Sequence, residues 1–355
     1  MLALEERRQI LRQMPETIRG VEQLEDLLST PPAELVDRFA QLRGDILILG
    51  VGGKIGPSLA RMAKRASEQA GVFKRIIGVS RFTSRPTKDY LEQHGVETIT
   101  GDLLDSKFLE QLPDVENVLF LAALKFGAAA NKTLTWAMNV KLPALVADRY
   151  RASRIVAFSS GNVYPYVTAD SGGCTETDET GPVGEYAQTV LGRERMFEYG
   201  SEEHGTEVVI LRLNYAVEMR YGVLVDIGLM VKNGIPVDLS NGHVNVIWQG
   251  DNNSMTLQAL DHCSTPAKIL NITGPETLSV RDIAMQFGRA LGVEPKFRNQ
   301  ESAQALLSDA SRAMQLFGRP RVSAEQMVLW IADWLERDLP LLNKPTAFEV
   351  TDGTY

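Results

Sequence analysis

Cysteines and long apolar runs are scarce in this chain of 355 residues. The two cysteines, Cys174 and Cys263, are far apart and have neither a Cys-x-x-Cys nor a zinc-ligand spacing. We therefore expect no disulfide framework, no metal and a reducing compartment. The most apolar stretch, 118–123, is far too short to cross a bilayer, and residues 1–8 lack the apolar core of a signal peptide. These absences predict a cytoplasmic protein with no membrane partner.

Basic residues are fewer than acidic ones. The chain has 37 Lys and Arg against 45 Asp and Glu, a net charge of -8, and no basic run is dense enough to form a local nucleic-acid surface. The composition, 44% hydrophobic and 23% charged, is that of an ordinary globular protein with one large domain or two lobes. We therefore expect a small-molecule substrate as the partner and no nucleic acid.

The most informative segment is 45–56, where a buried-strand pattern runs into a glycine-rich turn and then into a helical segment. In a dinucleotide site of this kind, the first glycine makes the tight turn, the second brings backbone close to a pyrophosphate, and the third packs the helix against the strand. Here those positions are Gly50, Gly53 and Gly56. The phosphates then lie at a helix N-terminus, so the segment predicts dinucleotide binding.

Apolar strand segments alternate with helical segments after this turn. The expected strands are 75–79, 97–99, 115–121, 154–158 and 207–211. Such alternation predicts an α/β fold, with a Rossmann-type doubly wound parallel sheet. We expect a helical extension of two short helices at 1–43, an NAD(P)-binding domain at 44–216, and a smaller substrate-binding lobe within 217–355.

A series of segments in the same order resembles the extended short-chain dehydrogenase/reductase superfamily, in particular the NAD-dependent epimerase/dehydratase family. The segments are the glycine-rich opening 49–56, the loop 101–105, the strand end 121–125, the serine segment 158–164, Tyr186, the strand 211–214, and the strand-loop-helix 271–280. The resemblance covers roughly residues 45–340. It implies a hydride-transferring enzyme and, because family members are commonly dimers, a homodimer.

By this resemblance, Ser160 would hold a substrate oxygen, and Tyr186 would exchange a proton with a substrate hydroxyl as hydride moves to or from nicotinamide. Asp102 would hydrogen-bond the adenine, and Leu103 would cover the ring. The residues expected to contact the cofactor are, in full, Gly50, Gly53, Lys54, Ile55, Gly56, Ser80, Arg81, Asp102, Leu103, Leu121, Ala122, Ala123, Lys125, Asn139, Ser160, Tyr186 and Asn214.

The chain departs from the family four residues after the tyrosine. There the family has a lysine that lowers the phenol pKa and holds the nicotinamide ribose, whereas this chain has Val190. A phenol with the ordinary pKa of about 10 is almost fully protonated at neutral pH. We hypothesise that Lys125, at a position where epimerases of the family also have a lysine, is a catalytic residue that supplies the missing positive field. Arg193 and Arg195, further along the helix, are expected to face solvent.

A second departure concerns the end of the second expected strand. NAD-preferring members have an acidic residue there that binds the adenosine ribose, whereas this chain has Ser80 and Arg81. A guanidinium suits a 2′-phosphate, because it can bind that group through two parallel hydrogen bonds. We therefore expect NAD(P) as the cofactor, with a preference for NADP.

The substrate class follows from a missing arginine. In nucleotide-sugar enzymes of the family an arginine grips the substrate pyrophosphate, but the matching stretch 241–251 contains none. A free carbohydrate, a sugar acid or a related hydroxy compound is therefore the expected substrate, and Lys125, Arg212 and Arg220 are candidates to pair with a carboxylate. Three functions remain open: an NAD(P)-dependent oxidoreductase or epimerase, a non-catalytic NAD(P)-binding regulatory or interaction protein, and a lyase or dehydratase that recycles a tightly bound NAD(P).

Overall fold

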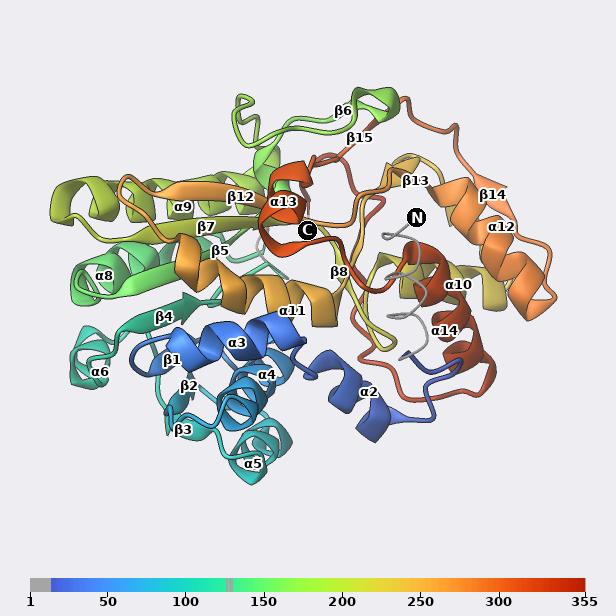
Figure 1. Cartoon of the computed structure of the whole chain (residues 1–355). Coiled ribbons are helices and arrows are strands. Elements are labelled where there is room, and N and C mark those ends of the chain that lie inside the picture. Colours follow the sequence, from blue (N-terminus) through green and yellow to red (C-terminus); the bar gives the residue numbers. More distant parts are fainter. Residues whose placement is uncertain (1–13, 126, 128–129, 355) are drawn as a thin grey trace.

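A seven-stranded parallel sheet forms the centre of the larger lobe (Figure 1). The computed structural model describes residues 14–125, 127 and 130–354, so the first part of the expected helical extension lies outside the described residues. The strands are β1 (Ile46–Leu49), β2 (Ile76–Ser80), β3 (Glu97–Thr100), β4 (Asn117–Phe120), β5 (Arg154–Ser160), β7 (Val208–Leu213) and β12 (Lys268–Ile272). Their order across the sheet is β12-β7-β5-β4-β1-β2-β3.

The predicted doubly wound sheet is therefore confirmed. Each of the neighbouring strand pairs is parallel, and the strand order reverses between β1 and β4. At such a reversal, the loops leave the carboxyl ends of the strands in opposite directions and open a crevice for ligands. Both β1 and β4 are buried at every residue, which explains why they read as continuous apolar runs rather than as alternating ones.

Helices cover both faces of this sheet. One face packs against α3 (Ala33–Gln41), α4 (Gly56–Gln69), α5 (Arg85–Gln93), α11 (Gln249–Gln258) and α13 (Ser311–Phe317). The other face packs against α6 (Ser106–Gln111), α8 (Leu142–Arg149) and α9 (Gly184–His204). Between β4 and α8 lie α7 (Lys132–Trp136) and a π-helical turn, Ala137–Lys141.

A smaller lobe is built mainly from the C-terminal third of the chain (Figure 1). It contains α10 (Val223–Lys232), α12 (Val280–Leu291) and α14 (Ala324–Glu336), which pack around the buried Trp248, Trp330 and Trp334. Short strand pairs complete it and join it to the sheet: β8 (Ala216–Val217) with β11 (Ile247–Trp248), β9 (Val237–Asp238) with β14 (Phe297–Arg298), β10 (His243–Val244) with β13 (Leu278–Ser279), and β6 (Val167–Thr168) with β15 (Gln304–Ala305).

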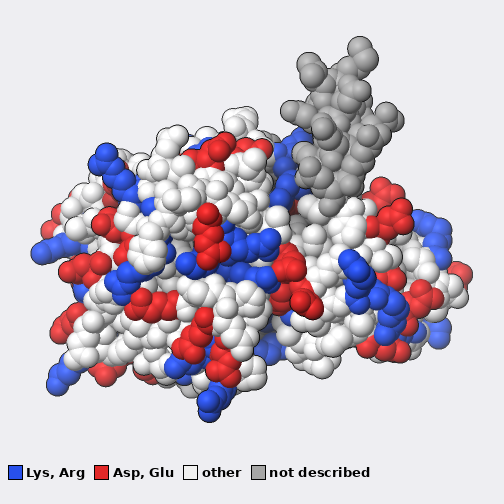
Figure 2. All heavy atoms as spheres, turned by 60° about the horizontal axis from the view of Figure 1, so that its bottom comes forward, with Lys and Arg blue, Asp and Glu red and all other residues white. Residues whose placement is uncertain are grey.

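The surface and the helices give two further observations. Acidic and basic side chains are intermixed over the face seen in Figure 2, and they do not form one extended basic surface there. Within the described ranges, no helix is long and apolar enough to cross a membrane.

The described part of the N-terminal segment contains two helices, α2 (Val21–Leu28) and α3, separated at Pro31 and Pro32. Leu24 and Leu28 of α2 belong to the core of the smaller lobe, whereas Leu35 and Phe39 of α3 belong to the core beneath the sheet. The N-terminal segment therefore ties the two lobes together.

We expect Leu24→Ala to lower the free energy of unfolding by about 2–5 kcal/mol, because it removes a fully buried side chain and leaves a cavity. The matched variant on the same helix is Val21→Ala, whose side chain is 36% exposed, and its expected change is within about 0.5 kcal/mol. Urea unfolding followed by circular dichroism measures both. Equal, small effects would show that α2 is a detachable surface segment.

Candidate functional site

The glycines of the turn between β1 and α4 differ in the space around them. A Cβ on Gly50, whose φ is +89°, would lie 2.6 Å from the Ala122 nitrogen, and a Cβ on Gly56 would lie 2.1 Å from the Val51 oxygen. These two positions must therefore be glycine for the backbone to pack. A Cβ on Gly53 would meet only the Gly50 oxygen, at 3.5 Å, so the space beside Gly53 is open. A dinucleotide pyrophosphate fits this arrangement, because exposed backbone N–H groups and the α4 N-terminus both favour an anion.

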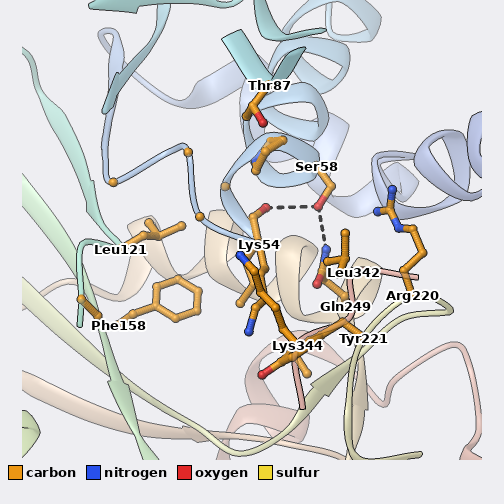
Figure 3. A pocket seen from close by; sticks show the side chains of 18 of the residues that line it. Lys54, Ser58, Thr87, Leu121, Phe158, Arg220, Tyr221, Gln249, Leu342 and Lys344 are labelled. Atoms are coloured by element: carbon orange, nitrogen blue, oxygen red, sulfur yellow. Dashed lines mark hydrogen bonds between the residues drawn. The ribbon is translucent and has the colours of Figure 1, made fainter. Parts of the chain in front are cut away.

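A cavity of about 1420 Å³ begins at this turn and extends to the smaller lobe. Its walls are the turn itself, the ends of β4 and β5, the first turn of α9, and residues of the smaller lobe such as Tyr221 and Lys344 (Figure 3). Pockets for one drug-sized ligand usually measure about 300–1,000 Å³. This cavity therefore has room for two ligands side by side.

Most of the residues expected to contact a cofactor line this cavity. They are Gly50, Gly53, Lys54, Ile55, Gly56, Leu121, Ala123, Lys125, Ser160, Tyr186 and Asn214. The expected residues that do not line it are Ser80, Arg81, Asp102, Leu103, Ala122 and Asn139.

The residues expected at the adenosine end lie beyond the cavity wall. Arg81 and Asp102 are exposed, and Leu103 is buried. Ser80 borders the glycine turn, because a Cβ on Gly52 would lie 2.5 Å from its hydroxyl. The end of the cavity nearest to them is lined instead by Thr83, Ser84, Thr87 and Tyr90, which the sequence interpretation did not single out.

Ser160 and Tyr186 meet at the cavity wall. Ser160 ends β5, and its hydroxyl donates to Asn162 Oδ1 at 2.8 Å. Tyr186 lies in the first turn of α9, is 8% exposed, and shares a side-chain hydrogen bond with Ser160. Burial raises the Tyr186 pKa, whereas the Arg193 guanidinium and the hydrogen bond shared with Ser160 lower it; burial prevails, so the pKa lies above its ordinary value.

The expectation that Arg193 faces solvent is wrong. Its side chain is 3% exposed and lines the cavity. The guanidinium donates through Nη1 to the Phe158 oxygen and through Nη2 to Asn139 Oδ1, both at 2.9 Å, and its Nε has no hydrogen-bond partner among the described residues. Residue i+7 of a helix returns to the face of residue i, so Arg193 shares the buried face of α9 with Tyr186. Arg195 is exposed and pairs with Glu198 at 2.5 Å, as expected.

Val190 and Asn139 support the site from behind the cavity wall. Val190 is fully buried in an apolar cluster with Val163 and Tyr164. Asn139, in the π-helical turn, accepts from the Leu124 N–H at 2.9 Å and donates to the Leu124 oxygen and to Thr189 Oγ1, both at 3.0 Å. Its amide therefore holds the loop that carries Lys125 in place.

Two lysines in the cavity have strongly lowered pKa values. Burial lowers the Lys54 pKa to about 7, helped by the charges of Lys125 and Lys344 and opposed by Asp226. Burial also lowers the Lys125 pKa to about 8, again opposed by Asp226. The Lys54 Nζ lies 3.4 Å from the centroid of the Tyr221 ring, and the Lys125 Nζ lies 5.7 Å from that of Tyr186.

The arginines proposed as carboxylate partners are already in ion pairs within the protein. Arg212 donates to Glu194 at 3.0 and 2.8 Å and to the Tyr164 hydroxyl at 2.8 Å. Arg220 lines the cavity but pairs with Glu25 at 2.7 Å and with Glu218 at 3.0 Å. Lys125, the third candidate from the sequence, lines the cavity.

Both ends of the described chain contribute to the cavity wall. Glu22, Glu25 and Asp26 of α2 line it, and so do Leu342, Lys344 and Thr346 of a segment we call the C-terminal strap, residues 341–354. The strap is fastened where Thr346 donates twice to Asp226 Oδ2, from N at 2.7 Å and from Oγ1 at 2.6 Å. No local sequence pattern predicts the contact between Thr346 and Asp226, because the two residues are 120 positions apart in the chain.

A match to a family model agrees with this geometry. Residues 46–217 match the model of the NAD dependent epimerase/dehydratase family. The expected resemblance, to a family of extended short-chain dehydrogenases/reductases, is thereby confirmed over this segment. No curated protein is significantly similar to the chain in sequence.

Similar solved structures include three epimerases. The UDP-glucuronic acid 4-epimerase of Bacillus cereus, solved with UDP-glucuronic acid and NAD, is 18% identical over 82% of this chain and 99% of its own, with a TM-score of 0.69. The UDP-glucose 4-epimerase of Thermotoga maritima, solved with UDP-glucose, is 17% identical over 83% and 99%, with a TM-score of 0.68. That of Thermus thermophilus, solved with NAD, is 19% identical over 82% and 99%, with a TM-score of 0.67. At sequence identities this low, the structural similarity establishes a shared fold and nothing more.

The lowered lysine pKa values predict an unusual reactivity. An amine reacts with cyanate only when it is unprotonated, so at pH 7.5 we expect Lys54 to be carbamylated at least about tenfold faster than an ordinary lysine. Lys107, exposed on α6, is the internal reference. Peptide mass spectrometry after timed labelling measures both rates, and equal rates would refute the lowered pKa of Lys54.

Proposed function

We propose that this protein is an NAD(P)-dependent oxidoreductase or epimerase that acts on a small carbohydrate, a sugar acid or a related hydroxy compound. The observation that carries the proposal is the meeting of Ser160, Tyr186 and Arg193 at a cavity that also contains the open side of Gly53. The NAD in the solved neighbours from Bacillus cereus and Thermus thermophilus supports the choice of cofactor.

The chemistry is proton exchange coupled to hydride transfer. A bound nicotinamide would accept or deliver the hydride. Ser160 would hold the reacting oxygen of the substrate, and Tyr186 would take or give its proton. A hydroxyl-bearing carbon loses hydride more easily when its hydroxyl proton leaves at the same time, because the electron pair that stays on oxygen then forms the carbonyl.

We infer that Arg193 does part of the work of the family lysine that Val190 replaces. Its guanidinium lowers the Tyr186 pKa across the cavity wall, and its unpartnered Nε is a buried donor that a ligand can satisfy. Because burial still keeps the Tyr186 pKa above its ordinary value, the phenol is protonated at neutral pH. Carbonyl reduction, which consumes that proton, is therefore favoured near neutrality, and alcohol oxidation is favoured at alkaline pH.

The proposed preference for NADP rests on Ser80 and Arg81. Arg81 is exposed at the end of β2, where its guanidinium is available to a 2′-phosphate. If it binds that phosphate, Arg81→Ala weakens NADPH binding about tenfold and leaves NADH binding unchanged. Equal binding of both nucleotides by the native chain would assign the cofactor as NAD.

One observation favours a second candidate, a nucleotide-binding regulatory protein without catalysis. Val190 removes the charge that holds the nicotinamide ribose in the family, and its side chain packs into an apolar cluster instead of lining the cavity. This candidate predicts tight cofactor binding with no turnover. The stretch 241–251 contains no arginine, which favours free sugars over UDP-linked sugars as substrates. A substrate screen should therefore contain both kinds of sugar.

The first test is a fluorescence titration with NADPH and NADH. Gly53→Asp should abolish binding, because it puts a carboxylate into the open space beside the turn while meeting little protein. Gly20→Asp is the matched control, because a Cβ there has nothing within 4 Å and the residue caps α2. Binding that survives Gly53→Asp, or no binding by the native chain, would overturn the proposal.

A second test follows the role of Arg193. In Arg193→Gln the rate of alcohol oxidation should require a more alkaline solution, its pH profile moving up by about one unit or more, because an opposite charge within a few ångströms shifts a pKa by about 1–3 units. Arg193→Lys keeps the charge and should restore most of the native profile. Tyr186→Phe should have no measurable turnover while still binding cofactor. An unchanged profile in Arg193→Gln would exclude the electrostatic role.

A further inference from the structure

Three lysines from distant parts of the chain meet at one wall of the cavity. Lys54 comes from the glycine turn, Lys125 from the loop after β4, and Lys344 from the C-terminal strap. Figure 3 shows Lys54 and Lys344 in the same part of the cavity as Tyr221. The ammonium groups of Lys125 and Lys344 both act on that of Lys54, so like charges are held close together here.

At Lys54 the repulsion from Lys125 and that from Lys344 each exceed the attraction of Asp226. One carboxylate, that of Asp226, attracts both Lys54 and Lys125, and its Oδ2 already accepts two hydrogen bonds from Thr346. The acidic residues that line the cavity among the described residues all lie on α2. Of these, Glu25 pairs with Arg220 and Asp26 pairs with Arg61. The lysine wall is therefore a positively charged part of the cavity.

This wall lies on the substrate side of the cavity rather than over the phosphate-binding turn. The Lys54 side chain leaves the turn and places its Nζ 3.4 Å from the centroid of the Tyr221 ring, and both Tyr221 and Lys344 lie outside the strands of the central sheet. The Tyr186 phenol acts electrostatically on that of Tyr221, and the Lys125 Nζ lies 5.7 Å from the centroid of the Tyr186 ring. An anion at the wall would thus lie beside the group that exchanges a proton with the substrate.

We propose that the substrate is a small polyol that carries an oxyanion of its own, a carboxylate or a phosphate, and that Lys54, Lys125 and Lys344 bind this group. The proposal rests on the proposed function, because that function places the reacting hydroxyl at Tyr186. An ammonium that donates to an oxyanion makes a charge-assisted hydrogen bond, which is stronger than a bond between neutral groups. The same anion would relieve the repulsion among the three lysines.

Calorimetric titration of the full-length protein with saturating NAD⁺ at pH 6.5 tests this assignment. The probes are D-glucose, D-glucuronate and D-glucose 6-phosphate, which differ in their anionic group. We expect at least one anionic sugar to bind about tenfold or more tightly than glucose, and the better of the two identifies the group as carboxylate or phosphate. Lys344→Met and Lys54→Met should each lose about tenfold in affinity for that sugar. Lys107→Met, on the exposed face of α6, should lose nothing.

The result can also overturn the assignment. If glucose binds as well as both anionic sugars, or if Lys344→Met leaves their affinity unchanged, the lysine wall does not select an oxyanion. If UDP-glucose binds more tightly than either anionic sugar and depends on the same lysines, the wall holds a nucleotide diphosphate and the small-acid assignment is wrong. These outcomes are separate from failure of the proposed function, which is detected when NAD⁺ and NADPH do not bind to the native chain.

Discussion

The site depends on the close backbone approach at the glycine turn. β1 and β4 lie next to each other where the strand order reverses, and the absence of side chains at Gly50 and Gly56 lets the turn pass against Ala122 and Val51. The start of α4 is thereby fixed above the sheet, and the direction of Lys54 is fixed with it. Because the ends of β4 and β5 meet the same edge, Lys125, Ser160 and the first turn of α9 converge on one crevice.

Charge inside this crevice is governed by burial. At Tyr186 the cost of placing a phenolate away from water exceeds what Arg193 and Ser160 return, and at Lys54 burial outweighs the attraction of Asp226. Burial therefore lowers the fraction of each group that carries a charge in the described structure. A ligand that brings a complementary charge changes this balance, so the protonation states of the cavity are set jointly by the protein and its contents.

The fold was predictable from the sequence because its signals are local. The apolar run 46–49, the glycine turn after it, and the alternation of strands and helices each need only neighbouring residues to be recognised. Gly50, Gly53, Ser160 and Tyr186 were selected in the same way, and all four line the cavity.

What the sequence did not predict depends on contacts between distant residues. Arg193 looks like a surface residue until the strand that supplies Phe158 is packed beneath it, and the two are 35 residues apart. By sequence alone Arg220 is a candidate partner for a substrate carboxylate, but in the structure it pairs with Glu25 of the N-terminal helix α2. Lys344 lies in a segment without a motif, and contacts of the strap with distant residues, such as the hydrogen bonds from Thr346 to Asp226 and from Leu342 to Arg220, hold it at the cavity.

The two ends of the described chain share one wall, and this has a consequence for biosynthesis. Glu25 is made long before Lys344. Before the strap has left the ribosome, the glycine turn can already form, but the far side of the cavity is still open. The nascent protein can thus acquire a nucleotide-binding surface before it has a complete compartment for a second ligand. Completion of that compartment requires synthesis of the strap.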